Sequence, residues 1–329
     1  MPSPSSQPEL GGATRQPSVD ARWALAGVDA VVLENAHLRL IVLPDLGGKL
    51  WQLTSKRKDF DWLWNNPRVA LRRAPYGADF DNYFLGGWDH PFPTLEPCLV
   101  DGEQFPYVGE LWSVPWQWRD CSAVEDGAAV EMQASATILP ARLYCRLALG
   151  DGASFSMTYR LQSVGTAPFK FTWGLHPCFA IDAATQFELP AGSATVIQSP
   201  EGGVGQEGAV YSWPYLAVNG QVRNISEALP SAARVYGLHE LQMQEGWFAV
   251  VQREHRLRLR VAFPLEVYPV IYLWMVYGGW RGIYHAAVEP WTGGGTSLAK
   301  AIEVGAARTL QPGESLESVV TVTIDDEYK

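Results

Sequence analysis

The amino-acid sequence predicts an all-β protein built as a large antiparallel β-sandwich. Apolar and polar residues alternate strictly over Val130–Ile138, and this period of two is typical of a strand with one buried face. Short turn sequences separate several such segments, as expected for antiparallel strands that follow one another. No long stretch has the period of a helix, and strands do not alternate with helices, which excludes doubly wound and barrel α/β folds.

The strands expected near the start of the chain are short and separated by turn-forming residues. Ala30–Glu34, His37–Leu43 and Lys49–Leu53 have the composition of strands. Asn35-Ala36 and Pro44–Gly48 lie between them and contain residue types that favour turns. The sequence therefore predicts three strands in this region.

The clearest series of strands covers residues 115–162. After Val130–Ile138, the segments Leu143–Leu149 and Phe155–Leu161 alternate in the same way, and Gly150–Gly152 between them is a tight hairpin signal. Asp126-Gly127 is a similar signal before the first of these strands. We therefore expect consecutive antiparallel strands here. The same alternation recurs later in Leu257–Phe263 and Val320–Ile324.

The chain is expected to contain one domain after a disordered tail. Residues 1–20 are rich in Ser, Pro, Gly and Gln and lack the basic start and apolar run of a signal peptide. Residues 21–329 are predicted to form a single β-sandwich, within which Gly192–Gly208 is expected to be a long loop. No apolar stretch is long enough to span a bilayer, since Leu265–Val276 contains a glutamate and a proline.

The charge balance bears on the partners that the chain can bind. The net charge of −10 argues against a nucleic-acid partner, because phosphate backbones are bound by clustered cations. Solvated loops are the simpler explanation of the basic groups Lys56–Lys58 and Arg72–Arg73, although these groups leave a phosphorylated small molecule open as a ligand. The four cysteines form no Cys-x-x-Cys pair, so we expect reduced thiols and a cytoplasmic protein without membrane attachment.

Tryptophan is abundant, with 14 residues, and several of them stand beside turns and prolines. Trp112 and Trp274 are two of these. Core packing and loop anchoring explain such residues in most proteins. The functional alternative is sugar binding, because the C–H groups on one face of a pyranose ring pack well on an indole.

His176 is the first candidate for catalysis. The apolar alternation of Phe169, Phe171 and Trp173 leads into Gly174, and His176 follows where that strand ends. A histidine at the mouth of a sheet is suited to proton transfer near neutral pH. The alternative is a packed histidine that is hydrogen-bonded to the backbone.

Glu289 is the second candidate. It ends a short apolar run and precedes Pro290 and the glycine-rich segment Gly293–Gly295. A carboxylate in such surroundings costs free energy unless it is paired or its pKa rises, which is the environment of a general base. The alternative is a carboxylate that caps backbone amides at the end of a strand.

Two loops are further candidates for ligand binding. Phe84–Thr94 is too irregular for a core strand, and its Asp89 and His90 could bind hydroxyl groups. Gly109–Trp116 is a similar aromatic loop. The sequence has no phosphate-binding loop, no metal-ligand spacing and no nucleophile elbow, which favours chemistry without a metal or another cofactor.

Several segments together resemble the galactose mutarotase-like superfamily, to which the aldose 1-epimerases belong. They occur in the family's order and cover about residues 30–325. They are Leu38–Leu53, Gly86–Thr94 with Gly109–Trp112, Trp173–Phe179, Val288–Gly293 and Thr309–Glu314.

The resemblance implies a supersandwich of antiparallel strands that binds a sugar or sugar phosphate in an open cleft. It implies an isomerase that interconverts anomers without a cofactor, with His176 as general acid and Glu289 as general base. The base removes the proton of the anomeric hydroxyl while the acid protonates the ring oxygen; the ring opens and closes on the other face. The side chains that we expect to contact the sugar are Asp89, His90, Trp112, Trp274 and Arg281.

One residue departs from the family's pattern. Many members have a histidine directly before the Gly-Glu of the second motif, where it contacts the sugar, but this chain has Val108. His90 is a candidate for a replacement donor. The departure leaves open a non-catalytic carbohydrate-binding protein on the same fold, and a lyase, another isomerase or a purely structural role are further alternatives. The sequence does not decide the oligomeric state.

Overall fold

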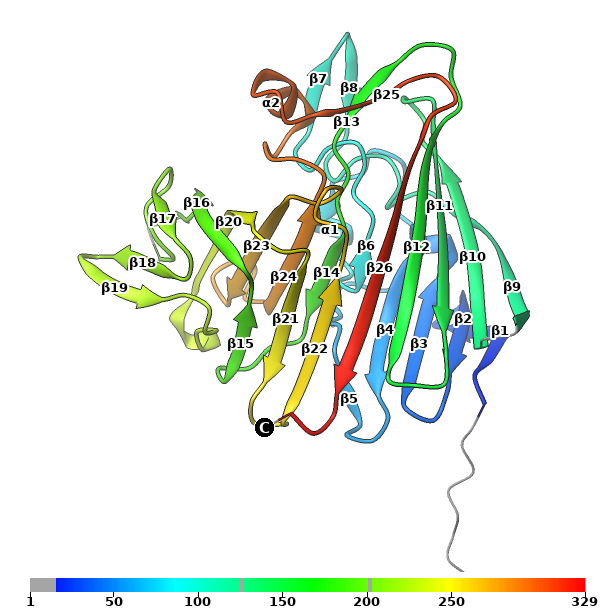
Figure 1. Ribbon diagram of the computed structural model, residues 1–329, viewed down its shortest axis with the longest axis horizontal. Coiled ribbons are helices and arrows are strands. Elements are labelled where there is room, and N and C mark those ends of the chain that lie inside the picture. Colours follow the sequence, from blue (N-terminus) through cyan, green and yellow to red (C-terminus); the bar gives the residue numbers. More distant parts are fainter. Residues whose placement is uncertain (1–15, 125–126, 201–202, 329) are drawn as a thin grey trace, which may run out of the picture.

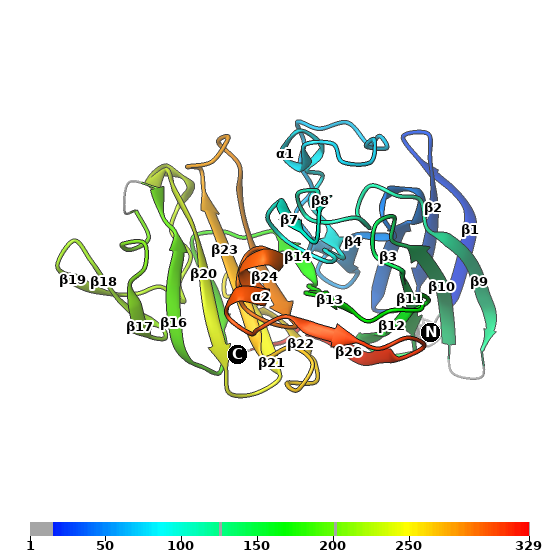
Figure 2. The same cartoon turned by 90° about the horizontal axis from the view of Figure 1, so that it is seen from above.

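The computed structural model describes residues 16–124, 127–200 and 203–328, and these residues form a sandwich of two large sheets (Figure 1). Every pairing between the named strands is antiparallel, except for bridges of single residues. Figure 2 shows the two layers from above, with β12, β22 and β26 in one layer and β3, β14 and β24 in the other. The predicted all-β fold is therefore confirmed.

The larger sheet has fourteen strands within the described residues and contains the elements that matter for function. Thirteen of them follow one another across the sheet as β1 (Ser18–Leu25), β2 (Val28–Glu34), β3 (Leu38–Leu43), β4 (Lys49–Ser55), β6 (Trp88–Asp89), β14 (His176–Phe179), β24 (Tyr284–Trp291), β23 (Val270–Tyr277), β20 (Val235–Met243), β16 (Ala191–Gln198), β17 (Val210–Ser212), β18 (Tyr215–Val218) and β19 (Gln221–Asn224). The short β5 (Phe60–Asp61) pairs with β4. The strand β14 thus lies near the middle of the sheet.

The second sheet has eight strands within the described residues and covers one face of the first. Its order is β15 (Thr185–Glu188), β21 (Trp247–Gln252), β22 (Leu257–Ala262), β26 (Ser315–Asp325), β12 (Ser154–Ser163), β11 (Ala141–Leu149), β10 (Gly127–Ser135) and β9 (Gln117–Val124). The consecutive antiparallel strands predicted between residues 115 and 162 are confirmed in β9 to β12.

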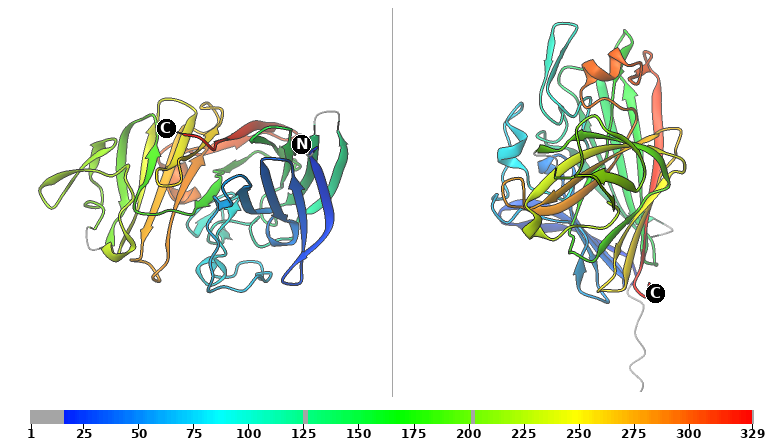
Figure 3. Two further views of the ribbon diagram at one scale, coloured as in Figure 1. Left: turned by 90° about the horizontal axis from the view of Figure 1, so that it is seen from below. Right: turned by 90° about the vertical axis from the view of Figure 1, so that its left-hand side faces the viewer.

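Short elements complete the fold. Two small antiparallel pairs are β13 (Phe169–Phe171) with β25 (Arg308–Leu310) and β7 (Cys98–Val100) with β8 (Glu103–Phe105). The helical elements are α1 (Phe80–Tyr83), α2 (Leu298–Glu303), and the 3-10 turns η1 (Pro44–Leu46) and η3 (Ser231–Ala233). The right-hand view of Figure 3 shows α1 and the β7–β8 hairpin on the side of the sandwich away from β26. Among the described residues, none of the helices has the length and apolar character needed to cross a membrane.

The core lies between the two sheets and explains the alternation in the sequence. In β11 every second side chain from Ala141 to Leu149 is buried, and the residues between them are only partly so. The buried set includes Leu143 and Leu147, which belong to one apolar cluster with Val31 and Leu40 of the larger sheet. Period-two alternation therefore identifies the face of each strand that becomes buried on folding.

Two glycines allow close approaches that shape the region around β14. A Cβ atom at Gly174 would lie 2.3 Å from the indole of Trp291, so the segment entering β14 can pack directly on the end of β24. Gly109 has φ +74°, and a Cβ atom there would lie 2.0 Å from the carbonyl oxygen of Phe92. A larger residue at either place would push these segments apart.

Parts of the predicted layout differ from the structure. The strand β1 begins at Ser18, so the end of the predicted tail 1–20 pairs with β2, and residues 1–15 lie outside the described residues. The segment Gly192–Gly208, expected to be a loop, begins inside β16. The register of β16 against β20 shifts twice, between Ala191 and Ala194 and between Val196 and Gln198, and such bulges break the alternation by which a strand is recognised. Asp126, from the predicted turn, lies outside the described residues.

Candidate active site

The two side chains predicted to transfer protons lie next to each other. His176 begins β14 and Glu289 lies in β24, which is the antiparallel neighbour of β14. His176 Nε2 is 3.5 Å from Glu289 Oε1, and both side chains are almost fully buried. The neighbouring backbone bond from Leu175 N to Pro290 O, at 2.9 Å, fixes this alignment of the two strands.

Aromatic rings and a thiol surround His176. Its ring stacks near Trp274, with centroids 6.1 Å apart, and meets Phe80 and Phe84 edge to face. Its Nδ1 lies 3.8 Å from the Cys178 sulfur, which is a weak hydrogen-bonding partner. The imidazole therefore has little polar support apart from Glu289.

Glu289 has one indole partner. The Trp291 Nε1–H donates to Glu289 Oε2 over 3.2 Å, and the other carboxyl oxygen faces His176. Tyr272 lies directly across from Glu289 on β23. The carboxyl group is thus held in one orientation by a single hydrogen bond while its second oxygen stays available for proton transfer.

Burial controls the protonation of the pair. Loss of water raises the pKa of Glu289 to about 8, although the Trp291 hydrogen bond opposes this rise. Loss of water, together with the charge of Lys49, lowers the pKa of His176 to about 3. At neutral pH the carboxyl is therefore protonated and the imidazole is neutral. One proton can therefore be transferred within the pair, and it resides on Glu289. An ion pair of imidazolium and carboxylate would contain the same number of protons.

The pair opens into a pocket of about 160 Å³. This volume is below the roughly 300–1,000 Å³ of pockets for drug-sized ligands, so it suits a ligand of monosaccharide size. Aromatic rings dominate the lining, and a few carboxyl and amide groups accompany them. The residues that line it are Phe80, Asp81, Leu95, Glu96, Tyr107, Val108, His176, Gln198, Tyr236, Leu238, Trp274, Trp280 and Glu289.

Of the predicted sugar contacts, Trp274 lines this pocket. Val108, the residue that departs from the expected pattern, lines it too. Asp89, His90, Trp112 and Arg281 are not among the described residues that line it. The positions of these four residues show what each does instead.

Asp89 and His90 are both buried, and neither lines the pocket. Asp89 lies opposite His176 in the β6–β14 pair, but its carboxyl binds the Lys49 ammonium, which also donates to Gly86 O at 2.8 Å. His90 packs between Trp116 and Tyr159 in the core, where burial lowers its pKa to about 3. His90 therefore does not replace the missing histidine at the pocket wall.

Trp112 and Arg281 support lining residues from behind. The Trp112 indole donates to Tyr107 O at 3.1 Å and meets the Phe80 ring edge to face, with centroids 5.0 Å apart. The Arg281 guanidinium donates to the Asp81 carbonyl at 2.6 Å and lies 3.9 Å from its carboxylate. Both residues hold side chains that line the pocket.

The predicted aromatic loop Gly109–Trp116 has a structural anchor. The Glu110 carboxylate accepts backbone hydrogen bonds from Thr137 at 2.6 Å and from Leu139 at 3.3 Å, and another from the Tyr76 hydroxyl at 3.1 Å. This residue therefore ties the loop to the connection between β10 and β11 in the second sheet.

Several lining residues have no signal in the sequence that points to the pocket. They come from a one-turn helix, from loops and from the ends of strands: Phe80, Asp81, Leu95, Glu96, Tyr107, Gln198, Tyr236, Leu238 and Trp280. Two of them stand beside a recognised motif: Leu95 follows Thr94, and Tyr107 precedes Val108. The others reach the site through loop conformation and through the pairing of β16 and β20 in the larger sheet, neither of which local patterning specifies.

The fold and the site together define a class of protein: a β-sandwich with a buried histidine–glutamate pair in a small aromatic pocket. No protein-family model and no curated protein sequence matches the chain. Among solved structures, a galactose mutarotase-like protein from Clostridium acetobutylicum is similar, with TM-score 0.67, 13% identity, and coverage of 94% of this chain and 99% of that one.

Two further solved structures are similar to this chain over most of its length. A galactose mutarotase-like protein from Lactobacillus casei has TM-score 0.64 and 16% identity, with 90% of this chain and 100% of that chain covered. The Slr1438 protein from Synechocystis has TM-score 0.67 and 18% identity, with 93% and 99% covered. The chain therefore has the galactose mutarotase-like fold that its motifs predicted.

Proposed function

We propose that this protein is a cofactor-independent isomerase that interconverts the anomers of a reducing sugar, as an aldose 1-epimerase does. The observation that carries the proposal is the 3.5 Å separation of His176 Nε2 and Glu289 Oε1 at the wall of a pocket of monosaccharide size. Both groups can then reach the two oxygens bonded to the anomeric carbon. Stacking on Trp274 and Trp280 would hold the ring, because both line the pocket.

The reaction balances with the single proton that the pair carries. One group takes the proton of the anomeric hydroxyl as the other gives a proton to the ring oxygen, the bond from the anomeric carbon to that oxygen breaks, and an open-chain aldehyde forms. Rotation about C1–C2 and the reverse transfers close the ring on the other face. We assign the acid to His176 and the base to Glu289. This assignment requires that sugar binding move the proton from the carboxyl to the imidazole.

The substitution Glu289→Gln tests this role. It should lower the enzymatic rate of anomer interconversion by about a hundredfold or more, since it removes one partner of an acid–base pair. Polarimetry measures the rate, and titration calorimetry checks that the sugar still binds. Glu254→Gln, at an exposed carboxylate, is the matched control. A normal rate in the Glu289 variant would refute the proposal.

A second candidate function is carbohydrate binding without catalysis. Val108 favours it, because this apolar side chain lines the pocket where a hydrogen-bonding histidine stands in many relatives. Binding of sugars by the wild-type protein without any effect on anomer interconversion would select this function.

The ligand is proposed to be a neutral sugar or a sugar phosphate. Arg281 donates to the Asp81 carbonyl in α1, and Arg68 donates to the carbonyl oxygens of Arg281 and Gly282. A phosphate group would have to draw these guanidinium groups from their present partners. We propose no nucleic-acid or membrane partner, and the cytoplasmic location stays a prediction from the cysteine pattern.

A further inference from the structure

A groove of about 470 Å³ crosses the outer face of the second sheet, on the strands β9 to β12, which lie side by side at the right of Figure 1. The buried residues of these strands pack into the core, so the residues that alternate with them point outward. The volume falls within the roughly 300–1,000 Å³ of ligand pockets. None of the described residues that line the groove also lines the pocket of His176 and Glu289, and the proposed reaction makes no use of it.

Strand pairing arranges the outward side chains in two rows. In the first row each residue lies directly opposite the next: Gln117, Gln133, Tyr144 and Arg160. The second row is formed in the same way by Arg119, Glu131 and Arg146. Met132 lines the groove between the rows, yet its side chain is buried in the core cluster, so the backbone forms the floor there.

Three arginines lie around Tyr144 in this groove. The Arg160 guanidinium lies over the Tyr144 ring, 4.2 Å from its centroid. Arg142 donates to the Tyr144 hydroxyl at 3.3 Å. Arg146 is the next outward residue of β11 and lies diagonally across from Arg160, with roughly 7–8 Å between their backbones. Three positive charges are therefore held close to one phenol.

The carboxylates near these arginines do not neutralise them. Within the described parts of the chain, Arg142 and Arg160 form no ion pair with a carboxylate. Glu131 is shared by the two other arginines of the groove, at 2.5 Å and 3.8 Å. Glu317 lies directly opposite Arg160 on β26 but forms no ion pair with it. The groove therefore has an excess of positive charge in a chain whose net charge is −10, and such a local excess attracts anions.

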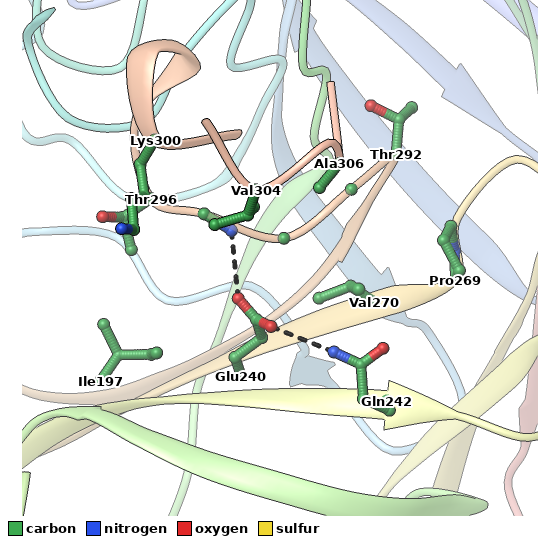
Figure 4. A pocket seen from close by; sticks show the side chains of 13 residues that line it. Ile197, Glu240, Gln242, Pro269, Val270, Thr292, Thr296, Lys300, Val304 and Ala306 are labelled. Carbon is green, nitrogen blue, oxygen red and sulfur yellow. Dashed lines mark hydrogen bonds between the residues drawn. The ribbon is translucent and has the colours of Figure 1, made fainter. Parts of the chain in front are cut away.

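A larger hollow, of about 660 Å³ over β20 and β23, has the opposite charge (Figure 4). Figure 4 shows the Glu240 carboxylate inside it, where it accepts hydrogen bonds from the Gly295 amide at 3.2 Å and the Gln242 amide at 3.0 Å. Lys300 also lines this hollow, but its ammonium pairs with Glu303 at 3.0 Å. An anion would be repelled by the carboxylate here, whereas the groove on β9 to β12 would attract it.

We propose that the groove is a binding site for the phosphate group of a small molecule, with Arg142 and Arg160 as its main ligands and Arg146 beside them. A guanidinium presents its donors in a planar fork that matches two phosphate oxygens. Tyr144 holds both forks in place before the ligand arrives, which lowers the entropy lost on binding. Further along the groove, the amide of Gln133 is placed to bind the rest of the molecule. This inference does not rest on the proposed function.

Pyrophosphate tests the site, because it presents phosphate oxygens on a small molecule. Titration calorimetry in about 0.15 M NaCl compares its affinity for wild type with that for Arg142→Gln and Arg160→Gln. Each substitution should weaken binding about tenfold, since it removes a charge-assisted hydrogen-bonding group. Glu317→Gln should tighten binding about twofold, because it removes the negative charge opposite Arg160. The matched control is Arg260→Gln in β22, where the guanidinium lies over Trp247 and outside the groove.

Binding that both groove variants weaken and the Arg260 variant keeps would support the site. The proposal is overturned if wild type does not bind pyrophosphate, or if both groove variants bind it as tightly as wild type. An equal loss in the Arg260 variant also overturns it, because the whole sheet face would then attract the anion. Arg281→Gln detects phosphate held near α1, and a loss in this variant alone would place the phosphate there instead. Arg142 and Arg160 are partly exposed, so their variants are expected to fold, and circular dichroism checks this.

Discussion

Replacing Glu289 with glutamine should stabilise the folded protein, and the gain should depend on pH. Burial raises the pKa of this carboxyl from its ordinary 4.5 to about 8, so the folded chain must keep a proton that the unfolded chain releases. The cost is absent below pH 4.5, grows as the pH rises and levels off above about pH 8. Between 4.5 and 7 it reaches about 3 kcal/mol, at about 1.4 kcal/mol per pH unit.

Glutamine avoids this cost because it is neutral at every pH. Its amide oxygen can still accept the Trp291 indole hydrogen bond, which spans 3.2 Å in the native protein. The variant should therefore match the wild type in stability near pH 4.5 and exceed it by about 3 kcal/mol at pH 7. Loss of activity with a gain in stability is the usual signature of a strained functional group.

Urea unfolding followed by tryptophan fluorescence measures this difference at several pH values between 4.5 and 8. The 14 tryptophans give a strong signal, and the matched control is Glu254→Gln, at an exposed carboxylate. Reversibility is checked by refolding from urea at each pH. A Glu289 variant that is no more stable than wild type at pH 7, or a gain that does not change with pH, would refute the argument that burial holds this proton.

The buried ionisable groups lead to two further predictions. The pair of His176 and Glu289 carries one transferable proton between the pKa values of about 3 and about 8. The value of kcat/KM should therefore be level from about pH 5 to 7 and fall above about pH 8, where that proton is lost. A rise in the enzymatic rate through pH 8 would contradict this expectation. Lys49→Met should cost about 3–5 kcal/mol of unfolding free energy, because it leaves the Asp89 carboxyl buried without its cation. Adding Asp89→Asn should recover part of that loss in urea unfolding, and a double variant no more stable than the single one would argue against the pairing.

The pattern of the sequence was sufficient for the strands that bury one face. In β11 and β12 each apolar residue of the alternation is buried, because a strand with water on one side must place its apolar residues on the other. The pattern fails in β16, where two register shifts interrupt the alternation and the composition of Gly192–Gly208 predicts a loop instead. Regular strands have an apolar period of two, whereas a bulge interrupts that period.

For the site, the sequence offered His176 and Glu289 as two separate candidates, and the resemblance to the mutarotase-like superfamily paired them as acid and base. It also placed Trp274 among the contacts. Only the tertiary structure decided that Asp89 binds Lys49, that Arg281 holds α1, and that residues without a motif, such as Gln198, line the pocket. Local sequence governs backbone periodicity, whereas which side chains meet at a pocket depends on contacts between segments far apart in the chain.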